Sequence, residues 1–228
     1  MNFLASWFVP DILYAALAVM VCLLVFVARQ AWLEIKIHSA PTAASLMILA
    51  ILWSLHIELG GSQLAGMNYH LLGMSLITLM LGAPAAIWLG ILMLFISTLL
   101  FYDTHNLVVL GLNGLVMLLI PAIVNILMRK LTAYLPDNVF VYIFINGFIA
   151  AALGMFATGL ITIILLQAAN VYPTEVLWSS AFPVFFLLSW GEAFLTGIFT
   201  AIFVALAPDL LSTFSDTRYL KPNNQIWK

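Results

Sequence analysis

The stretch HLLGMSLITLMLGAPAAIWLGILMLFISTLLF (residues 70–101) decides the fold. It is apolar almost throughout, and it is longer than the roughly 17 to 25 residues with which an α-helix crosses a bilayer. Gly82-Ala83-Pro84 lies inside it, and a glycine close to a proline is a turn signal. We therefore predict two membrane spans here, a short one that begins at His70 and a longer one that ends at Phe101.

Composition places the whole chain in lipid. Apolar residues make up 65% of the sequence and charged residues 7%, whereas soluble domains average roughly 45–50% and ~25%. The apolar runs are continuous rather than alternating, so their backbone groups are expected to be satisfied within helices and not in a β-barrel. We predict an all-α integral membrane protein, with residues 1–228 forming a single polytopic membrane domain.

Five further apolar segments complete a predicted topology of about seven transmembrane helices. They run over about Ile12–Ala28, Ala40–Leu55, Leu107–Met128, Val139–Leu166 and Leu177–Leu206. No basic residue precedes the first segment and Arg29 follows it. We therefore interpret that segment as a retained span and not as a cleaved signal peptide.

The basic residues predict the orientation, because Lys and Arg near span ends stay on the cytoplasmic side of a membrane. With seven spans all seven basic residues fall on one side; they are Arg29, Lys36, Arg129, Lys130, Arg218, Lys221 and Lys228. A single span over residues 70–101 would place Arg129 and Lys130 opposite Arg29. The charges thus support the division at Gly82, with the N-terminus outside and the C-terminus in the cytoplasm.

Several classes of function leave no signal in the sequence. The net charge of −2 gives no basic surface for nucleic acid. Cys22 is the only cysteine, which excludes an intrachain disulfide and a thiolate cluster. The phosphate loop GxxxxGK(S/T) is absent, so the chain is not expected to be its own ATPase. No catalytic constellation is recognisable, and we expect a protein that is not an enzyme.

Three of the four histidines fall on the predicted outer face, namely His56, His70 and His105, and they are accompanied there by Glu58 and Asp103. Imidazole and carboxylate groups suit divalent first-row metals such as Ni, Co, Zn or Cu. Taken singly, such residues are more often ordinary polar groups at the membrane interface. His70 stands out because it opens a short apolar span, where an ionisable group more often faces a cavity or a partner than lipid.

Polar residues inside the predicted spans leave two interpretations open. Glu192 lies near the middle of the last span, where a charged acid costs ~2.5–3.5 kcal/mol on translocon scales. It is either a pathway or packing partner inside the bundle, or a protonated acid bonded to a neighbouring helix. Asn113, Asn125 and Asn146 are typical of hydrogen bonds between helices.

A family resemblance is carried by NYHLLGMSLITLMLGAPAAIWLGILMLFISTLLFYD (residues 68–103) and by LVVLGLNGLVM, which starts at Leu107. Both are similar to the membrane substrate-binding subunits of cobalt and nickel energy-coupling-factor transporters, the CbiM and NikM type. The family's His-Leu-Leu-Gly, Phe-Gly-Asp-Gly, Leu-Gly-Ala-Asn and Gly-Glu-Gly patterns are matched by His70-Leu71-Leu72-Gly73, Phe101-Tyr102-Asp103, Leu110-Gly111-Leu112-Asn113 and Gly191-Glu192. The resemblance covers roughly residues 43–126 well and the rest loosely.

One departure from the family concerns the metal ligands. The family has a mature N-terminus reading Met-His-Ile, whose nitrogens join a later histidine around the metal, whereas this chain begins Met1-Asn2-Phe3. Of the family's ligands only His70 is matched. His56 and Glu58 are candidates to replace the lost ones. The candidate supporting residues are Asp103, His105, Asn113 and Glu192.

The resemblance implies a membrane permease or substrate-binding component for uptake of a transition metal ion, nickel or cobalt by analogy. It also implies an energy-coupling-factor type transmembrane subunit and ABC ATPases as partners, and a multi-pass location in a bacterial-type plasma (inner) membrane. The alternative is a membrane scaffold or assembly factor that keeps the fold without transporting anything. Metal binding by the purified protein would favour the first function.

Overall fold

The computed structural model describes residues 2–55, 57–58 and 64–219. Their regular secondary structure is helical apart from two short paired strands, β1 (Ile57–Glu58) and β2 (Asn68–Tyr69). The longer helices are α1 (Pro10–Ile37), α2 (Ser39–Ser54), α3 (Met74–Leu81), α4 (Ala83–Phe101), α6 (Ile120–Thr132), α8 (Ala150–Ala168) and α10 (Phe182–Leu206). Shorter turns extend or join them: η1 (Ala5–Trp7), η2 (Thr104–Val109), α5 (Leu110–Gly114), η3 (Leu115–Leu119), α7 (Val139–Val141), η4 (Tyr142–Ile149), α9 (Thr174–Val176), η5 (Leu177–Ala181), η6 (Pro208–Leu210) and α11 (Asp216–Tyr219).

Five helical runs among the described residues are long and apolar enough to cross a membrane, and α2 is a shorter apolar helix. The five are Pro10–Ile37, Ala83–Phe101, Thr104–Thr132, Val139–Ala168 and Thr174–Leu206. Each overlaps a segment that the sequence predicts. The prediction of an all-α membrane protein is thus confirmed, whereas the count of seven crossings and the orientation stay predictions.

The segment predicted as a short helix from His70 is helical only in its second half. α3 begins at Met74 and holds eight residues, all of them buried, which rise only about 12 Å. The residues before it lie outside any helix: Tyr69 of β2 pairs with Ile57 of β1, and Gly73 adopts a left-handed φ of 70°. Backbone outside a helix at membrane depth requires protein around it rather than lipid. The full burial of α3 is consistent with that requirement.

The predicted turn at Gly82 is confirmed as the point where α3 ends and α4 begins. Gly82 has a φ of 101°, a conformation that residues with a side chain rarely adopt. Glu34 of α1 lies against this turn, and its Oε2 accepts a hydrogen bond from the backbone N–H of Ala85 at 3.0 Å. The carboxylate thereby satisfies one of the free donors in the first turn of α4.

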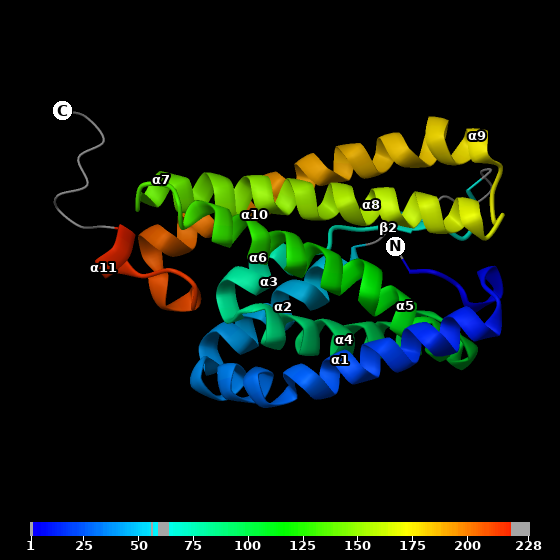
Figure 1. The fold of residues 1–228 in the computed structure, drawn as a ribbon, viewed down its shortest axis with the longest axis horizontal. Helices are drawn as coiled ribbons and strands as arrows, with labels where there is room; N and C mark the ends of the chain where they lie inside the picture. Colours follow the sequence, from blue (N-terminus) through cyan, green and yellow to red (C-terminus); the bar gives the residue numbers. More distant parts are fainter. Residues whose placement is uncertain (1, 56, 59–63, 220–228) are drawn as a thin grey trace.

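The helices at the centre of the bundle are buried, and the helices at its edges expose apolar side chains. In Figure 1, α8 and α10 lie side by side along one edge, α1 lies along the other, and α3, α4 and α6 lie between them. α1 buries only Leu13, Ala16, Met20 and Ala31, and its Phe26 is 85% exposed. Figure 1 also places η1 and α9 at one end of the bundle and α7 and α11 at the other. The N-terminal segment and the start of the last long helical run therefore lie at one end, and the segment after α10 lies at the other.

Thiol labelling from outside the cell tests the predicted topology. In a Cys22→Ala background we expect Thr174→Cys, at the start of α9, to react with an impermeant thiol reagent in intact cells. Tyr134, which is 88% exposed beyond α6, lies at the opposite end, so Tyr134→Cys should react only after the membrane is opened. Labelling of both variants in intact cells would contradict the seven-span topology.

Candidate metal centre

His70 follows β2 directly and is buried, with 8% of its surface exposed. Its Nδ1 lies 2.9 Å from the carbonyl oxygen of Leu71. Because a carbonyl oxygen can only accept a hydrogen bond, Nδ1 carries the proton and the lone pair of the neutral ring is on Nε2. Nε2 is therefore the atom through which His70 can bind a metal.

His70 shares a small cavity with the N-terminal segment of the chain. The cavity has a volume of about 20 Å³, and its lining residues are Asn2, Trp53, His70, Ser97, Phe101 and Tyr102. A space of this size holds one water molecule or one ion and little more. The side-chain oxygen of Asn2 is buried and has no hydrogen-bond partner among the described residues. A buried oxygen of this kind requires a donor or a cation as its partner.

Two asparagines hold the N-terminal segment at this cavity. Asn113 Oδ1 accepts a hydrogen bond from the backbone N–H of Phe3 at 2.8 Å, and Asn106 Oδ1 accepts one from the N–H of Ala5 at 2.9 Å. Asn113 is 1% exposed, so its bond to Phe3 is shielded from water. The contact fixes the backbone next to Asn2. Asn113 thus supports the cavity by positioning the N-terminal segment, although it does not line the cavity itself.

Trp53 of α2 fixes the other side of the histidine. Its ring centroid lies 5.7 Å from that of His70, and its Nε1–H donates to the carbonyl oxygen of Leu72 at 3.0 Å. Trp53 therefore contacts the imidazole and is bonded to the backbone of Leu72, two residues after His70. The Trp53 ring and the carbonyl of Leu71 together set the position of the imidazole.

Glu192 of α10 holds the backbone that follows His70. Its Oε2 accepts from the N–H of Leu72 at 2.9 Å and its Oε1 from the N–H of Gly73 at 2.7 Å. Both donors directly precede α3, which begins at Met74. A packing partner and a protonated acid bonded to a neighbouring element both agree with this contact, so the choice between the two predicted roles stays a prediction. In either form Glu192 positions the non-helical segment that carries His70.

A second, larger cavity opens beside the small one. It has a volume of about 710 Å³, and among its lining residues are Asn68, Asp103, His105 and Asn106. Phe101 and Tyr102 line both cavities, and the Tyr102 hydroxyl accepts a hydrogen bond from Asn68 Nδ2 at 2.6 Å. Phe101 and Tyr102 therefore lie between the two spaces, and Asn68 bonds Tyr102 from the side of the larger cavity.

The predicted site residues fall into separate groups. Asp103 and His105 line the larger cavity and not the cavity of His70. The backbone of Glu58 pairs with Asn68 in the strand ladder, two residues before His70. His56 lies outside the described residues. Across the described ranges, no three or more His, Cys, Asp or Glu side chains gather in a group that could hold a metal ion. Ligation by His70 with His56 and Glu58 therefore stays a prediction.

Sequence reasoning missed part of the cavity wall. It treated Asn2 only as the loss of a family ligand, and it did not single out Trp53, Ser97 or Tyr102. Tyr102 lies beside Asp103 in a polar joint, so its neighbourhood offered a signal. Trp53 and Ser97 lie within apolar helices and offer none, because their approach to His70 depends on how α2 and α4 pack.

Comparisons with known proteins agree with this architecture. The model of the CbiM family, described as the cobalt uptake substrate-specific transmembrane region, matches residues 4–210. A transition metal transporter solved by crystallography is similar in fold, with a TM-score of 0.75 and 22% sequence identity over 90% of this chain and 93% of its own. A truncated transition metal transporter gives a TM-score of 0.74 and 22% identity over 90% of this chain and 98% of its own. No curated protein matches the chain.

Removing the carboxylate of Glu192 should loosen the start of α3. Glu192→Ala leaves two buried N–H groups without an acceptor, at a cost of roughly 1–3 kcal/mol each, whereas Glu192→Gln keeps one acceptor oxygen. We expect thermal unfolding of the purified protein to shift down strongly for Glu192→Ala and less for Glu192→Gln. Ser189→Ala, one turn earlier, is the control, because that hydroxyl bonds only within its own helix. Equal stability of Glu192→Ala and Ser189→Ala would contradict the positioning role.

Proposed function

The chain belongs to the CbiM family, the cobalt uptake substrate-specific transmembrane region, and from that premise we propose that it binds a transition metal ion at the outer end of its bundle for uptake into the cell. The observation that supports this most is the shared cavity of Asn2 and His70. The family resemblance pairs the second residue of the chain with this histidine around the metal. The fold brings those two positions into one space.

The chemistry of the cavity fits a single cation as the transported substrate. His70 offers a ring nitrogen, and Asn2 offers a buried oxygen that no described donor contacts. Nitrogen and oxygen donors together suit borderline divalent metals. Because an amide oxygen replaces an imidazole nitrogen at residue 2, we expect weaker binding of nickel and cobalt than an imidazole at that position would give. His56 and Glu58 remain our candidates for completing the ligand set.

The larger cavity supplies a route toward this site. Asp103 and His105 line it, and a carboxylate at the mouth of a cleft raises the local concentration of cations. Phe101 and Tyr102 lie between the larger cavity and the cavity of His70. We infer that a cation collects beside Asp103 before it reaches His70.

Energy for uptake has to come from other proteins. The sequence has no P-loop motif, so the chain is not expected to hydrolyse ATP through a phosphate loop. We propose that it works with an energy-coupling-factor type transmembrane subunit and ABC ATPases, in a bacterial-type plasma (inner) membrane. The loss of the family's second-residue histidine favours one alternative, a scaffold that keeps the fold without carrying metal.

Metal titration of residue 2 and residue 70 separates the two functions. By calorimetry, we expect His70→Ala to weaken binding of Ni²⁺ or Co²⁺ by at least the 10–100-fold that loss of a supporting contact causes. Asn2→His should strengthen binding, because it adds an imidazole to the same cavity. His38→Ala is the control, since His38 lies between α1 and α2, away from the cavity.

Two outcomes of this titration would contradict the proposal. Parent-like affinity in His70→Ala would remove the histidine from the site. A parent protein that binds neither metal, together with an Asn2→His variant that gains nothing, would favour the scaffold. In both cases His38→Ala should bind the metal like the parent protein. A loss of binding in that control would indicate a fault of the preparation and not of the site.

Uptake in cells should depend on an ATPase encoded elsewhere. Cells that express the chain should accumulate the metal only when the cognate ATPase can hydrolyse ATP, and a variant of that ATPase with its phosphate-loop lysine replaced should reduce accumulation to background. Isotope or mass-spectrometric measurement of cell metal tests this. Uptake that persists without any ATPase would point to a channel that needs no energy input.

A further inference from the structure

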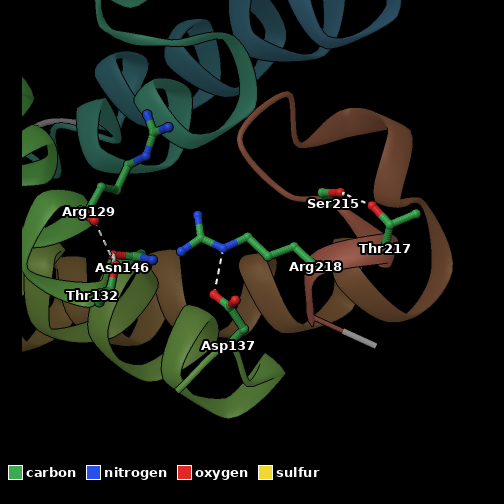
Figure 2. Close-up of polar contacts among 7 residues, drawn as sticks. All are labelled: Arg129, Thr132, Asp137, Asn146, Ser215, Thr217 and Arg218. Carbon is green, nitrogen blue, oxygen red and sulfur yellow. Dashed lines mark hydrogen bonds and ion pairs between the residues drawn. The ribbon is translucent and has the colours of Figure 1, made fainter. Parts of the chain in front are cut away.

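A basic cavity lies at the end of the bundle opposite to the metal centre. It has a volume of about 320 Å³ and is formed where α6 ends, η4 passes and α11 packs back on the bundle. Its described lining residues are Ile126, Arg129, Lys130, Thr132, Ala133, Asn146, Thr213, Arg218 and Tyr219. Figure 2 shows that Arg129 and Arg218 come from two different elements, with the side chain of Arg129 directed away from Asn146. None of its described lining residues lines either cavity of the proposed metal site.

The cavity has an excess of positive charge. Three cations line it, Arg129, Lys130 and Arg218, and no acidic residue is among its described lining residues. Asp137 lies beside it and forms an ion pair with Arg218, with 2.6 Å between Oδ1 and Nε. Both side chains of that pair are about two-fifths exposed, at 44% and 43%. Exposed ion pairs of this kind are weak, so Asp137 offsets the charge of Arg218 only in part, and the described lining residues keep an excess of positive charge.

The wall opposite α6 is held rigidly, which gives the cavity a fixed shape. Thr213 donates its hydroxyl proton to the carbonyl oxygen of Leu79 at 2.8 Å, and Tyr142 bonds the same hydroxyl at 2.7 Å. The ring of Tyr219 stacks on Phe214 at 5.3 Å between centroids. These contacts tie the segment that carries Arg218 to the core.

The inner wall is polar as well as rigid. Asn146 of η4 is 1% exposed, and its Oδ1 accepts a hydrogen bond from the Thr132 hydroxyl at 3.1 Å. Figure 2 shows Asn146 beside this hydroxyl and close to the guanidinium of Arg218. The cavity therefore combines guanidinium, ammonium and amide groups around one space. Such groups suit the oxygens of a phosphate group, to which arginine can donate two parallel hydrogen bonds.

The outer surface beside the cavity is apolar. Ile123, Leu127 and Leu131 of α6 are spaced four residues apart and are exposed by 43%, 56% and 53%. Residues at this spacing share one face of a helix. This face runs along α6 next to Arg129 and Lys130, so an acyl chain can lie on it while a headgroup reaches the basic cavity.

We propose that the basic cavity binds the phosphate group of an anionic lipid of the inner leaflet, with an acyl chain lying along Ile123, Leu127 and Leu131. Basic pockets between transmembrane helices on the cytoplasmic side bind anionic lipid headgroups in this way. The general retention of Lys and Arg on the cytoplasmic side explains why cations lie at this end. It does not explain why three of them line one cavity while Arg29 and Lys36 do not.

Native mass spectrometry of the protein in nanodiscs tests this site. The nanodiscs contain phosphatidylglycerol and phosphatidylcholine in equal amounts, and the fraction of protein that retains each lipid is measured. Arg129→Gln with Lys130→Gln removes two charges from the cavity, and Arg29→Gln with Lys36→Gln removes two charges outside it. Each cation at a membrane surface changes the affinity for anionic lipid about fivefold. We expect preference for phosphatidylglycerol to fall by at least about fivefold in the first pair and to fall clearly less in the second.

Asp137→Asn provides a test with the opposite sign. It releases Arg218 from its ion pair, so retention of phosphatidylglycerol should rise if the cavity binds the lipid, whereas a merely structural ion pair predicts a less stable protein with no gain in lipid. A separate arm adds inorganic phosphate to protein in neutral detergent. Displacement of the lipid by phosphate supports binding of a phosphate group in the cavity, and it shows that free phosphate competes with the lipid for that cavity. Equal loss of preference in both charge pairs, or no loss in either, would overturn the proposal.

Discussion

The pair of hydrogen bonds that Glu192 accepts from Leu72 and Gly73 is the contact on which the half of the bundle that carries His70 depends. Backbone that lies outside a helix at membrane depth leaves its donors without water to bond. One carboxylate satisfies two of those donors and is itself buried at 1% exposure. The bond thereby lets α3 begin deep in the protein. It also sets the position of His70, which lies two residues before Leu72.

The proposed metal centre is assembled from parts of the chain that are far apart in sequence. Asn113 bonds Phe3 across 110 positions, and Glu192 bonds Leu72 across 120. Each contact connects a buried side chain to backbone, and buried polar groups of this kind cost free energy when they lose their partners. The cavity thus depends on the fold as a whole and on no local motif. A substitution at Asn113 or Glu192 would act on the site without touching a metal.

The two ends of the bundle present opposite chemistry. The end that carries His70 offers an imidazole nitrogen and amide and carboxylate oxygens, which suit a cation. The other end offers two guanidinium groups and an ammonium group, which suit an anion. In both places the termini complete the site: the N-terminal segment carries Asn2, and α11 near the C-terminus carries Arg218. The proposed metal site and the proposed lipid site share no residue, so we expect substitutions to alter them independently.

The sequence by itself determined the membrane-spanning helices, the turn at Gly82 and the family, because these follow from apolar run length, from the conformational freedom of glycine and from local motifs. It also pointed to His70 and to the ambiguity of Glu192. Only the tertiary structure decided that residues 70–73 lie outside any helix, that Glu192 holds the backbone just before α3, and that Asn2 lies with His70 while Asp103 and His105 line a separate cavity. These outcomes depend on which distant groups meet when helices pack. Composition and periodicity report how each helix faces lipid, but they carry no information on such pairings.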